Sequence, residues 1–346
     1  MSGHGRTHLR FAAKSLSWDG DDLVDYVGGG DRITLDGEVT EARRSYGYPF
    51  NRAVVSPSGR YWAVYDLRGT KGVVLGPDPE EDPAKSRPWW KGVKILREID
   101  RSYYHARDYE YPITLGTLAN GEEAIVHCPD SYCSIAIDRV EDGSRVATWS
   151  KESSVFHSRL SLSPSGRWLL SAGWVWHPFG FARVYDAEKV IADPQDPDNQ
   201  AVFSFGGLDA EAEGVCWLSD NSLVVSTNPE WPEDDDPDRS DPGLSKGELG
   251  IWSMTEHDWV SRCRYPAHTG TMLPFGDWVL SLYDHPKLLD PMTGSVLDEW
   301  PEIRTGTQTG SIHPSESLPP VAVDATRDRF AVGGEEEIVV VEVSGG

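Results

Sequence analysis

The chain has 346 residues, of which 38% are hydrophobic and 25% charged, so it can bury a sizeable core and does not have the composition of a disordered chain. Its formal net charge of −24 repels phosphate backbones and anionic lipid surfaces, so we expect no nucleic acid and no membrane among its partners. The 34 glycines and 24 prolines, with short apolar segments between them, favour many strands joined by turns.

Residues 1–22 contain no apolar stretch of the kind that forms a secretory signal, and no segment approaches the roughly 18 apolar residues of a membrane span. We therefore expect a cytoplasmic protein. The four cysteines should then be thiols, and none stands in a CxxC motif or at zinc spacing from a histidine. Cys128 and Cys133 flank an expected hairpin tip, so a disulfide between them is the alternative.

A pattern of apolar strand, polar turn and second apolar strand occurs seven times along the chain. Its clearest copies are VVSPSGRYWAVY, which starts at Val54, and SLSPSGRWLLSA, which starts at Ser161. Glycine, asparagine and aspartate tolerate the positive φ of tight hairpin turns, and each copy has one of them at the turn. In chain order, these turn residues are Gly20, Gly59, Gly121, Gly166, Asn221, Gly276 and Asp328.

Each copy is followed by a second apolar segment, and the first six lead on to another, which gives units of four short strands, a to d. Seven such units predict an all-β fold, a single β-propeller of seven four-stranded blades, because ring closure gives every blade two neighbours and protects the sheet edges. Six or eight blades are the alternatives. The expected blades occupy residues 14–46, 51–99, 112–150, 156–206, 212–266, 268–301 and 319–344 of one domain that spans 1–346.

The seventh unit ends after its third strand. Residues 7–13, with the sequence THLRFAA, form a spare apolar segment ahead of the first unit. We expect this N-terminal segment to supply the outer strand of the last blade, where it would join the two ends of the chain and hold the ring closed. The alternative is a frayed N-terminal tail.

Three segments, SPSGRYWAVYD, SPSGRWLLSAG and LLDPMTGSVLDEW, resemble the repeats of the bacterial WD-repeat-like β-propellers. The resemblance covers nearly the whole chain as a pattern and implies the same ring of four-stranded blades. The repeats of this chain are degenerate: the Gly-His pair that opens a standard repeat is missing, and the Trp-Asp pair is reduced to TLD, AID, VYD and LLD. The resemblance therefore does not imply the Asp–His network of that family.

In a propeller, the a–b and c–d turns share one face, and the b–c and d–a loops share the other. Aromatic residues gather in three loops of the second face, expected at 100–111, 173–180 and 228–247. These loops flank consecutive blades, and Tyr and Trp are enriched at binding hot spots, so we expect one patch that binds a partner. The alternative is that the aromatic side chains pack down onto the sheets. The candidate binding residues are Tyr103, Tyr104, His105, Tyr109, Trp174, Trp176, His177, Phe179 and Trp231.

Patterns for metal binding and catalysis are weak in this sequence. Asp234, Asp236 and Asp238 alternate as in a calcium loop, but Pro237 interrupts them, and the required Gly and Glu are out of register. Glu213 precedes an apolar strand and is the candidate ligand for a metal in the central channel. No G-x-S-x-G elbow and no phosphate-binding glycine loop occurs, so we assign no catalytic residue and no cofactor.

The sequence therefore predicts a non-catalytic scaffold that presents an aromatic and acidic loop face to a protein or peptide, and the charge favours a basic partner. One alternative is a propeller enzyme, such as a metal-dependent lactonase-like hydrolase, with its site in the channel or on the loop face. Another is a small-molecule or glycan binder, because stacked Trp and Tyr suit sugar rings. The sequence leaves the oligomeric state open.

Overall fold

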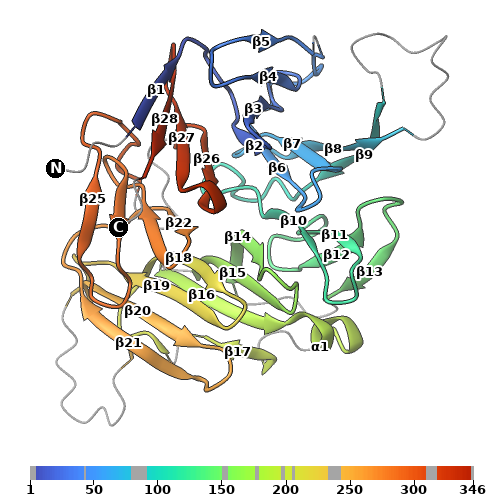
Figure 1. Ribbon diagram of the computed structural model, residues 1–346. Coiled ribbons are helices and arrows are strands. Elements are labelled where there is room, and N and C mark those ends of the chain that lie inside the picture. Colours follow the sequence, from blue (N-terminus) through green and yellow to red (C-terminus); the bar gives the residue numbers. More distant parts are fainter. Residues whose placement is uncertain are drawn as a thin grey trace.

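The computed structural model is a ring of seven four-stranded antiparallel sheets, which confirms the predicted seven-bladed propeller (Figure 1). The only departure from β structure longer than one turn is α1 (Ala187–Ala192), a short helix between two strands of one blade, as far as the described residues go. The structure describes residues 5–42, 44–78, 92–149, 155–175, 179–195, 199–204, 207–232, 243–308 and 318–343.

Within blades 1 to 6, the four strands follow one another in chain order from the centre of the ring toward its rim (Figure 1). Blades 1 to 3 contain β2 (Ser17–Asp19), β3 (Asp22–Asp25), β4 (Asp31–Ile33) and β5 (Val39–Thr40); β6 (Arg52–Val55), β7 (Trp62–Tyr65), β8 (Lys71–Pro77) and β9 (Val93–Asp100); and β10 (Ile113–Thr117), β11 (Glu123–His127), β12 (Ala136–Arg139) and β13 (Arg145–Thr148). Blades 4 to 6 contain β14 (Val155–Leu162), β15 (Trp168–Val175), β16 (Phe179–Asp186) and β17 (Ala201–Phe203); β18 (Ala212–Ser219), β19 (Ser222–Thr227), β20 (Glu248–Ser253) and β21 (Asp258–Arg264); and β22 (Met272–Phe275), β23 (Trp278–Ser281), β24 (Lys287–Leu289) and β25 (Val296–Glu299).

Blade 7 joins the two ends of the chain. It contains β26 (Val321–Asp324), β27 (Arg329–Gly333), β28 (Ile338–Glu342) and, as its outer strand, the N-terminal β1 (Gly5–Leu9). The predicted clasp is confirmed, but its strand is shifted from the expected 7–13. Gly5 pairs with Glu342 and Leu9 with Ile338, so the strand ends where its partner β28 begins and no further residue is available for pairing.

An arginine also fastens blade 7 to blade 1. The Arg329 guanidinium lies 3.9 Å from the centroid of the Trp18 ring, and its Nη2 donates to Gly20 O at 2.8 Å. Trp18 Nε1 in turn donates to Ala322 O at 3.3 Å. Side chains of both blades therefore reinforce the seam at which the ring closes.

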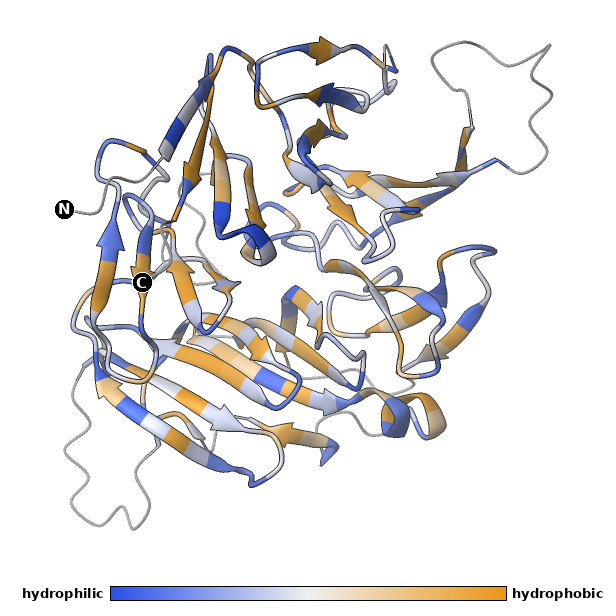
Figure 2. Ribbon diagram, viewed as in Figure 1, coloured by the Kyte–Doolittle hydropathy of each residue, from blue (hydrophilic) through white to orange (hydrophobic). Residues whose placement is uncertain are grey.

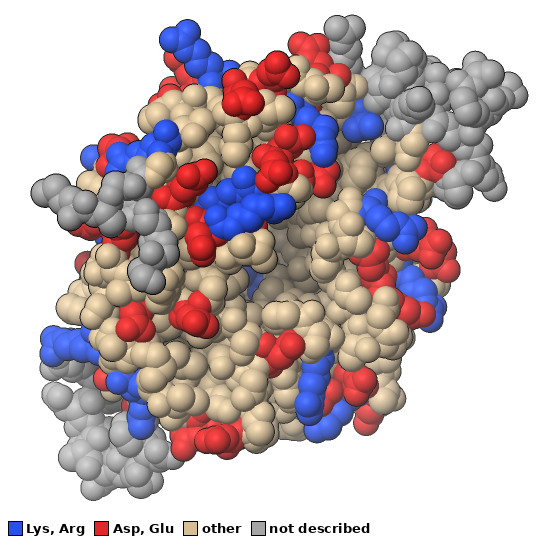
Figure 3. Space-filling view, viewed as in Figure 1, with Lys and Arg blue, Asp and Glu red and all other residues tan. Residues whose placement is uncertain are grey.

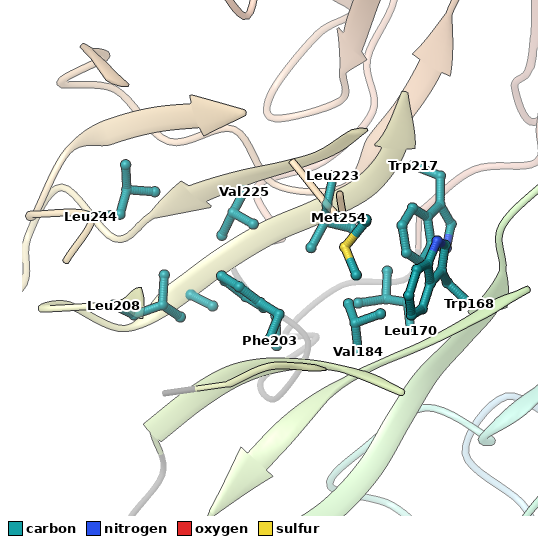
Figure 4. Close-up of a cluster of buried hydrophobic side chains, with 12 residues drawn as sticks. Trp168, Leu170, Val184, Phe203, Leu208, Trp217, Leu223, Val225, Leu244 and Met254 are labelled. Carbon is teal, nitrogen blue, oxygen red and sulfur yellow. The ribbon is translucent and has the colours of Figure 1, made fainter. Parts of the chain in front are cut away.

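Seven hydrophobic clusters fill the seams between neighbouring blades, one in each seam of the described ring. Figure 2 shows the hydrophobic residues concentrated in the strands. Figure 4 shows the cluster between blades 4 and 5, where Trp168 of blade 4 lies beside Trp217 of blade 5. Each large apolar side chain buried in this way contributes about 1.5–3 kcal/mol, so the blades are stable only as neighbours in the ring.

The two faces of the ring carry different connections. We call the face with the d–a and b–c connections, such as 101–112 and 128–135, the loop face. We call the opposite face, with the a–b turns such as 56–61 and 163–168, the turn face. Figure 3 shows a hollow at the centre of the ring, with acidic and basic side chains on the blades around it.

The two SPSG segments form the same turn in blades 2 and 4. In blade 2, Ser56 N donates to Tyr61 O at 2.8 Å, and Ser56 Oγ accepts from Tyr61 N at 3.3 Å. In blade 4, Ser163 N donates to Trp168 O at 2.8 Å, and Ser163 Oγ accepts from Trp168 N at 3.2 Å. The first serine of the motif closes the turn, so the repeated segment is a building unit of the fold.

The predicted positive φ is present at six of the seven turn residues, with values from 48° to 86°. The prediction is wrong for Asn221, which does not have positive φ. There Ser219 Oγ accepts from Asn221 N at 3.2 Å, and Asn221 O accepts from Met254 N at 2.9 Å. A side chain and the neighbouring c–d turn thus hold this hairpin in a different conformation.

Blade 3 contains a buried His–Asp contact that the degenerate repeats did not lead us to expect. His127 Nε2 lies 3.0 Å from Asp138 Oδ2, and Arg145 Nε donates to the other carboxylate oxygen. Burial acts to raise the pKa of Asp138, but the contacts with His127 and Arg145 outweigh it and hold this pKa below its ordinary value. The Asp of the AID segment is therefore an ionised part of the blade interior.

All four cysteines are free thiols, as predicted, and the alternative bridge between Cys128 and Cys133 is not formed. Both thiols are buried, and burial raises the pKa of Cys128 far above its ordinary value. Among the described helices, none has the length and apolar character that a membrane crossing requires.

Candidate functional site

A buried arginine holds the loop that enters blade 3. Arg101 follows β9 directly and donates to the carbonyl oxygens of Ala106 at 2.6 Å and Glu110 at 3.0 Å. It also donates to Gly69 O at 2.7 Å, in the b–c connection of blade 2. Its Cζ lies 4.6 Å from the centroid of the Tyr109 ring. Arg101 therefore fixes the shape of the loop and ties it to the preceding blade.

Four aromatic rings form a stack on the loop face. The ring centroids of Tyr104 and Tyr132 are 5.1 Å apart, and their planes differ by 29°. Tyr132 and Phe156 follow at 4.0 Å and 19°. Phe156 and Trp174 complete the stack at 4.4 Å and 14°. We call Tyr104, Tyr132, Phe156 and Trp174 the aromatic column; it joins the loop that enters blade 3, the b–c connection of blade 3, and two strands of blade 4.

The column runs from the surface into the protein. At its outer end, Tyr104 is 42% exposed, and the adjacent Tyr103 is 87% exposed. His105 has a φ of 52°, and its Nδ1 lies 2.7 Å from Asp108 Oδ2, which braces the turn beneath the two tyrosines. At the inner end, Trp174 is only 8% exposed. The accessible aromatic surface therefore belongs to Tyr103 and Tyr104.

The structure brings four predicted binding residues together around Phe156: Tyr104, His105, Tyr109 and Trp174. Tyr109 and Trp174 pack inward. Tyr109 is fully buried and contacts Phe156 edge-on at 5.6 Å, and Trp174 lies in the stack. The prediction of a loop over 173–180 is wrong at its described ends. Gly173 to Val175 belong to β15, because β14 and β15 pair as far as Val155 with Val175. For Tyr109 and Trp174, the alternative prediction, in which aromatic side chains pack down onto the sheets, is therefore the one that holds.

A second aromatic pair lies next to the column. Phe179 and Trp231 contact each other edge-on, with ring centroids 5.1 Å apart. Phe179 pairs with Val175 across the β15–β16 hairpin, one residue from Trp174. The predicted Trp176 and His177 lie outside the described residues.

Glu230, which precedes Trp231 in the chain, belongs to a group of two carboxylates and one histidine. Glu213 Oε2 lies 3.2 Å from His268 Nδ1, and His268 Nε2 lies 3.6 Å from Glu230 Oε1. The hydrogen bond with Glu213 is the largest cause that raises the pKa of His268, and it outweighs burial. The side chain of Glu230 is 80% exposed, so its carboxylate is open to solvent beside Trp231.

The candidate metal ligands are not arranged as a metal site in the described part of the chain. There, no group of three or more His, Cys, Asp or Glu side chains is placed to hold one ion. Glu213 Oε1 instead accepts from the backbone N–H groups of Thr269 and Gly270, both at 2.9 Å. Asp234, Asp236 and Asp238 lie outside the described residues.

A charged cluster ties loops together across the centre of the loop face. Arg159 of blade 4 donates to both carboxylate oxygens of Glu110, which precedes blade 3, at 3.0 and 2.9 Å. Gln308, which precedes blade 7, donates to Glu110 Oε1 at 2.9 Å. Burial acts to raise the pKa of Glu110, but Arg159 and Gln308 outweigh it and lower this pKa. Loops from distant parts of the ring are thereby locked to one carboxylate.

Three residues that form or support the aromatic column were not among the sequence candidates. Tyr132 lies between the two cysteines of an expected hairpin, and its aromatic character in a b–c connection was the signal that could have included it. Phe156 is the second residue of β14, the first strand of blade 4, and its sequence pattern is that of an ordinary core residue. Arg101 had no sequence signal, because its partners are backbone carbonyl groups, which no sequence pattern records.

No family model and no curated protein matches this sequence. Solved structures match the fold. The chain in "Structure of U3-55K" aligns with a TM-score of 0.58 at 11% identity over 98% of each chain. A chain in "Crystal Structure of Mitotic Checkpoint Complex" aligns with a TM-score of 0.57 at 12% identity over 96% of this chain and 90% of that one. With seven four-stranded blades, the fold is that of a WD-repeat-like propeller.

Proposed function

We propose that this chain is a non-catalytic scaffold that binds a protein or peptide partner on its loop face. The observation that carries the proposal is the exposure of Tyr103 and Tyr104 at the outer end of the aromatic column. Large apolar side chains that remain exposed on an ordered surface are typical of binding hot spots, and tyrosine is enriched there.

The order of the loop favours tight binding. Arg101 holds the loop from below through several carbonyl groups, and Tyr132 stacks against Tyr104 from the side. A partner that packs on Tyr104 would therefore immobilise little additional protein. Binding to a preorganised surface loses less conformational entropy than binding to a loop that must first become ordered.

The charge of the protein favours a partner with basic residues. The chain carries a formal net charge of −24, and Glu230 and Asp108 present exposed carboxylates on the loop face. Such a field accelerates the encounter with a cationic surface and weakens as salt is added. One of the similar folds is that of a chain in "Crystal Structure of Mitotic Checkpoint Complex", which agrees with the use of this fold in assemblies.

The test compares partner recovery by two double variants of the full chain. Tyr103→Ala with Tyr104→Ala removes the exposed aromatic surface. Val296→Ala with Leu297→Ala removes exposed apolar surface of β25, at 46% exposure for each residue, and serves as the control. We expect the protein that co-purifies with the unaltered chain to be lost only with the tyrosine variant. Equal recovery with both variants, or no reproducible partner of the unaltered chain, would contradict the proposal.

A further inference from the structure

A separate pocket opens on the turn face between blades 4 and 5. It has a volume of about 400 Å³, within the range of small-molecule sites. Its walls come from the a–b turn and helix α1 region of blade 4 and from the a–b and c–d turns of blade 5. No residue of the aromatic column lines it, so it is distinct from the docking surface proposed above.

The inner wall of the pocket is apolar. Trp168, Met254 and Val202 contribute to it, and all three belong to the hydrophobic cluster between the two blades. Figure 4 shows Trp168 beside Trp217 at one end of that cluster, with Met254 between Leu223 and the two tryptophans. Trp168 and Met254 are held by packing on both blades and are 6% and 1% exposed, so the half-buried Val202 is the most exposed of the three side chains in this rigid wall.

The rim of the pocket carries cationic groups. The Arg167 Cζ lies 4.5 Å from the centroid of the Trp168 ring, and no carboxylate of the described residues forms an ion pair with Arg167. Lys189 Nζ forms an ion pair with Asp186 Oδ2 at 3.9 Å, and the Lys189 side chain is 72% exposed.

The two carboxylates of the pocket are already engaged by the protein. Asp186 Oδ1 accepts from Lys189 N at 3.2 Å, where it caps the helix. Asp220 Oδ1 accepts from Ser165 N at 2.5 Å, where it joins the a–b turns of blades 4 and 5. Arg167 is therefore the cationic donor of the rim that no described carboxylate pairs with, whereas Lys189 shares Asp186 with the helix cap.

The twin SPSG turn of blade 2 shows what is special here. Arg60 also lies over the following aromatic ring, 5.3 Å from the centroid of Tyr61. In that seam, however, the next blade presents Glu123 and Glu141. The charges of these two carboxylates raise the pKa of Tyr61, whereas the charge of Arg60 lowers it. In the seam of Arg167, Asp220 takes the place of Glu123, and the other lining residues of the blade 5 turns are Asn221, Thr255 and His257, which carry no carboxylate.

We propose that the pocket between blades 4 and 5 binds a small organic anion. Its apolar part lies against Val202 and the accessible part of Trp168, and its carboxylate or phosphate group accepts hydrogen bonds from Arg167 and Lys189. Charge-assisted hydrogen bonds from a guanidinium group suit both kinds of anion. The proposal does not depend on the docking surface: the calorimetry below can fail while partner recovery through Tyr103 and Tyr104 succeeds, and the reverse.

Isothermal titration calorimetry on the full chain tests it with two matched pairs of probes. Indole-3-acetate is compared with neutral indole-3-ethanol, and adenosine monophosphate with adenosine, so the two arms separate a carboxylate from a phosphate source. We expect at least one anion to bind about tenfold or more tightly than its neutral counterpart, as one charged hydrogen bond implies. We expect Arg167→Gln to remove most of that difference and Lys189→Gln to reduce it.

Arg60→Gln is the control, because it alters the same motif and the same kind of arginine–aromatic contact in blade 2. It should leave the affinity unchanged, and the melting temperature of each variant verifies folding. The proposal is overturned if neither anion binds at millimolar concentration, if the neutral probes bind equally well, or if Arg60→Gln weakens binding as much as Arg167→Gln does.

Discussion

The turn face and the loop face of this ring are built in different ways. On the turn face, short hairpins recur, and those of blades 2 and 4 share the same serine hydrogen bonds. On the loop face, no two connections described above are alike, and single side chains such as Arg101 and Glu110 hold them together. A substitution on the turn face should therefore destabilise one hairpin. A substitution of a linking side chain on the loop face should loosen several loops at once.

The largest expected effect comes from a glycine of the turn face. Gly166 has a φ of 74°, and a Cβ there would lie 1.8 Å from Thr117 O of blade 3. Gly59, its counterpart in blade 2, has a φ of 71° with nothing within 4 Å. Gly166→Ala should lower the free energy of unfolding by about 3–5 kcal/mol, because a backbone must move. Gly59→Ala should cost about 1–2 kcal/mol of backbone strain. Urea denaturation measures both, and equal losses would show that the blade contact at Gly166 is unimportant.

The next effect concerns the carboxylate at the centre of the loop face. Glu110→Ala leaves the partly buried Arg159 without its partner and should lower the free energy of unfolding by about 3 kcal/mol. The control is Glu122→Ala, which removes an exposed Glu–Arg pair with Arg139 and should change little. The pKa of Glu110 is lowered in the folded state, so its contribution is present above the unfolded pKa and is lost as the pH falls through the folded value. A Glu110 variant as stable as the Glu122 variant would argue against a locked loop face.

The smallest effect is a pH dependence on the loop face. The pKa of His268 is raised in the folded state by Glu213, so its protonation stabilises the fold fully below the unfolded pKa of about 6.5. This contribution disappears as the pH rises through the raised folded pKa. The stability difference between the unaltered chain and His268→Gln should therefore shrink as the pH rises from neutral to mildly alkaline. Denaturation curves at a series of pH values measure it, and a constant difference would contradict the assigned contact.

The fold could be predicted from the sequence because its repeat is local. Gly59 and Gly166 mark hairpins whose two strands are adjacent in the chain, so alternation and turn residues define them directly. The closing strand could also be expected, since the last unit lacked a partner for its third strand. Its bounds could not be predicted, because they depend on where β28 begins and ends.

The site could be predicted only in part, because ring geometry decides which residues meet. Tyr103 and Tyr104 were identified by composition and are exposed. Trp174 belongs to a strand rather than a loop, since β15 extends further than its sequence indicates. Phe156 joins the column only because β14 places it beside Trp174 across two paired strands. Contacts of this kind become visible once the strand register is known.

The most direct test of the account is to place a photo-crosslinking amino acid at two positions in the full chain. One replaces Tyr103 on the loop face, and the other replaces Arg60 on the turn face, at a residue that is also exposed. The account predicts that position 103 crosslinks to one specific partner in extracts of the source cell, and that added salt weakens this crosslink. Crosslinking of the same partner from position 60 and not from position 103 would contradict it.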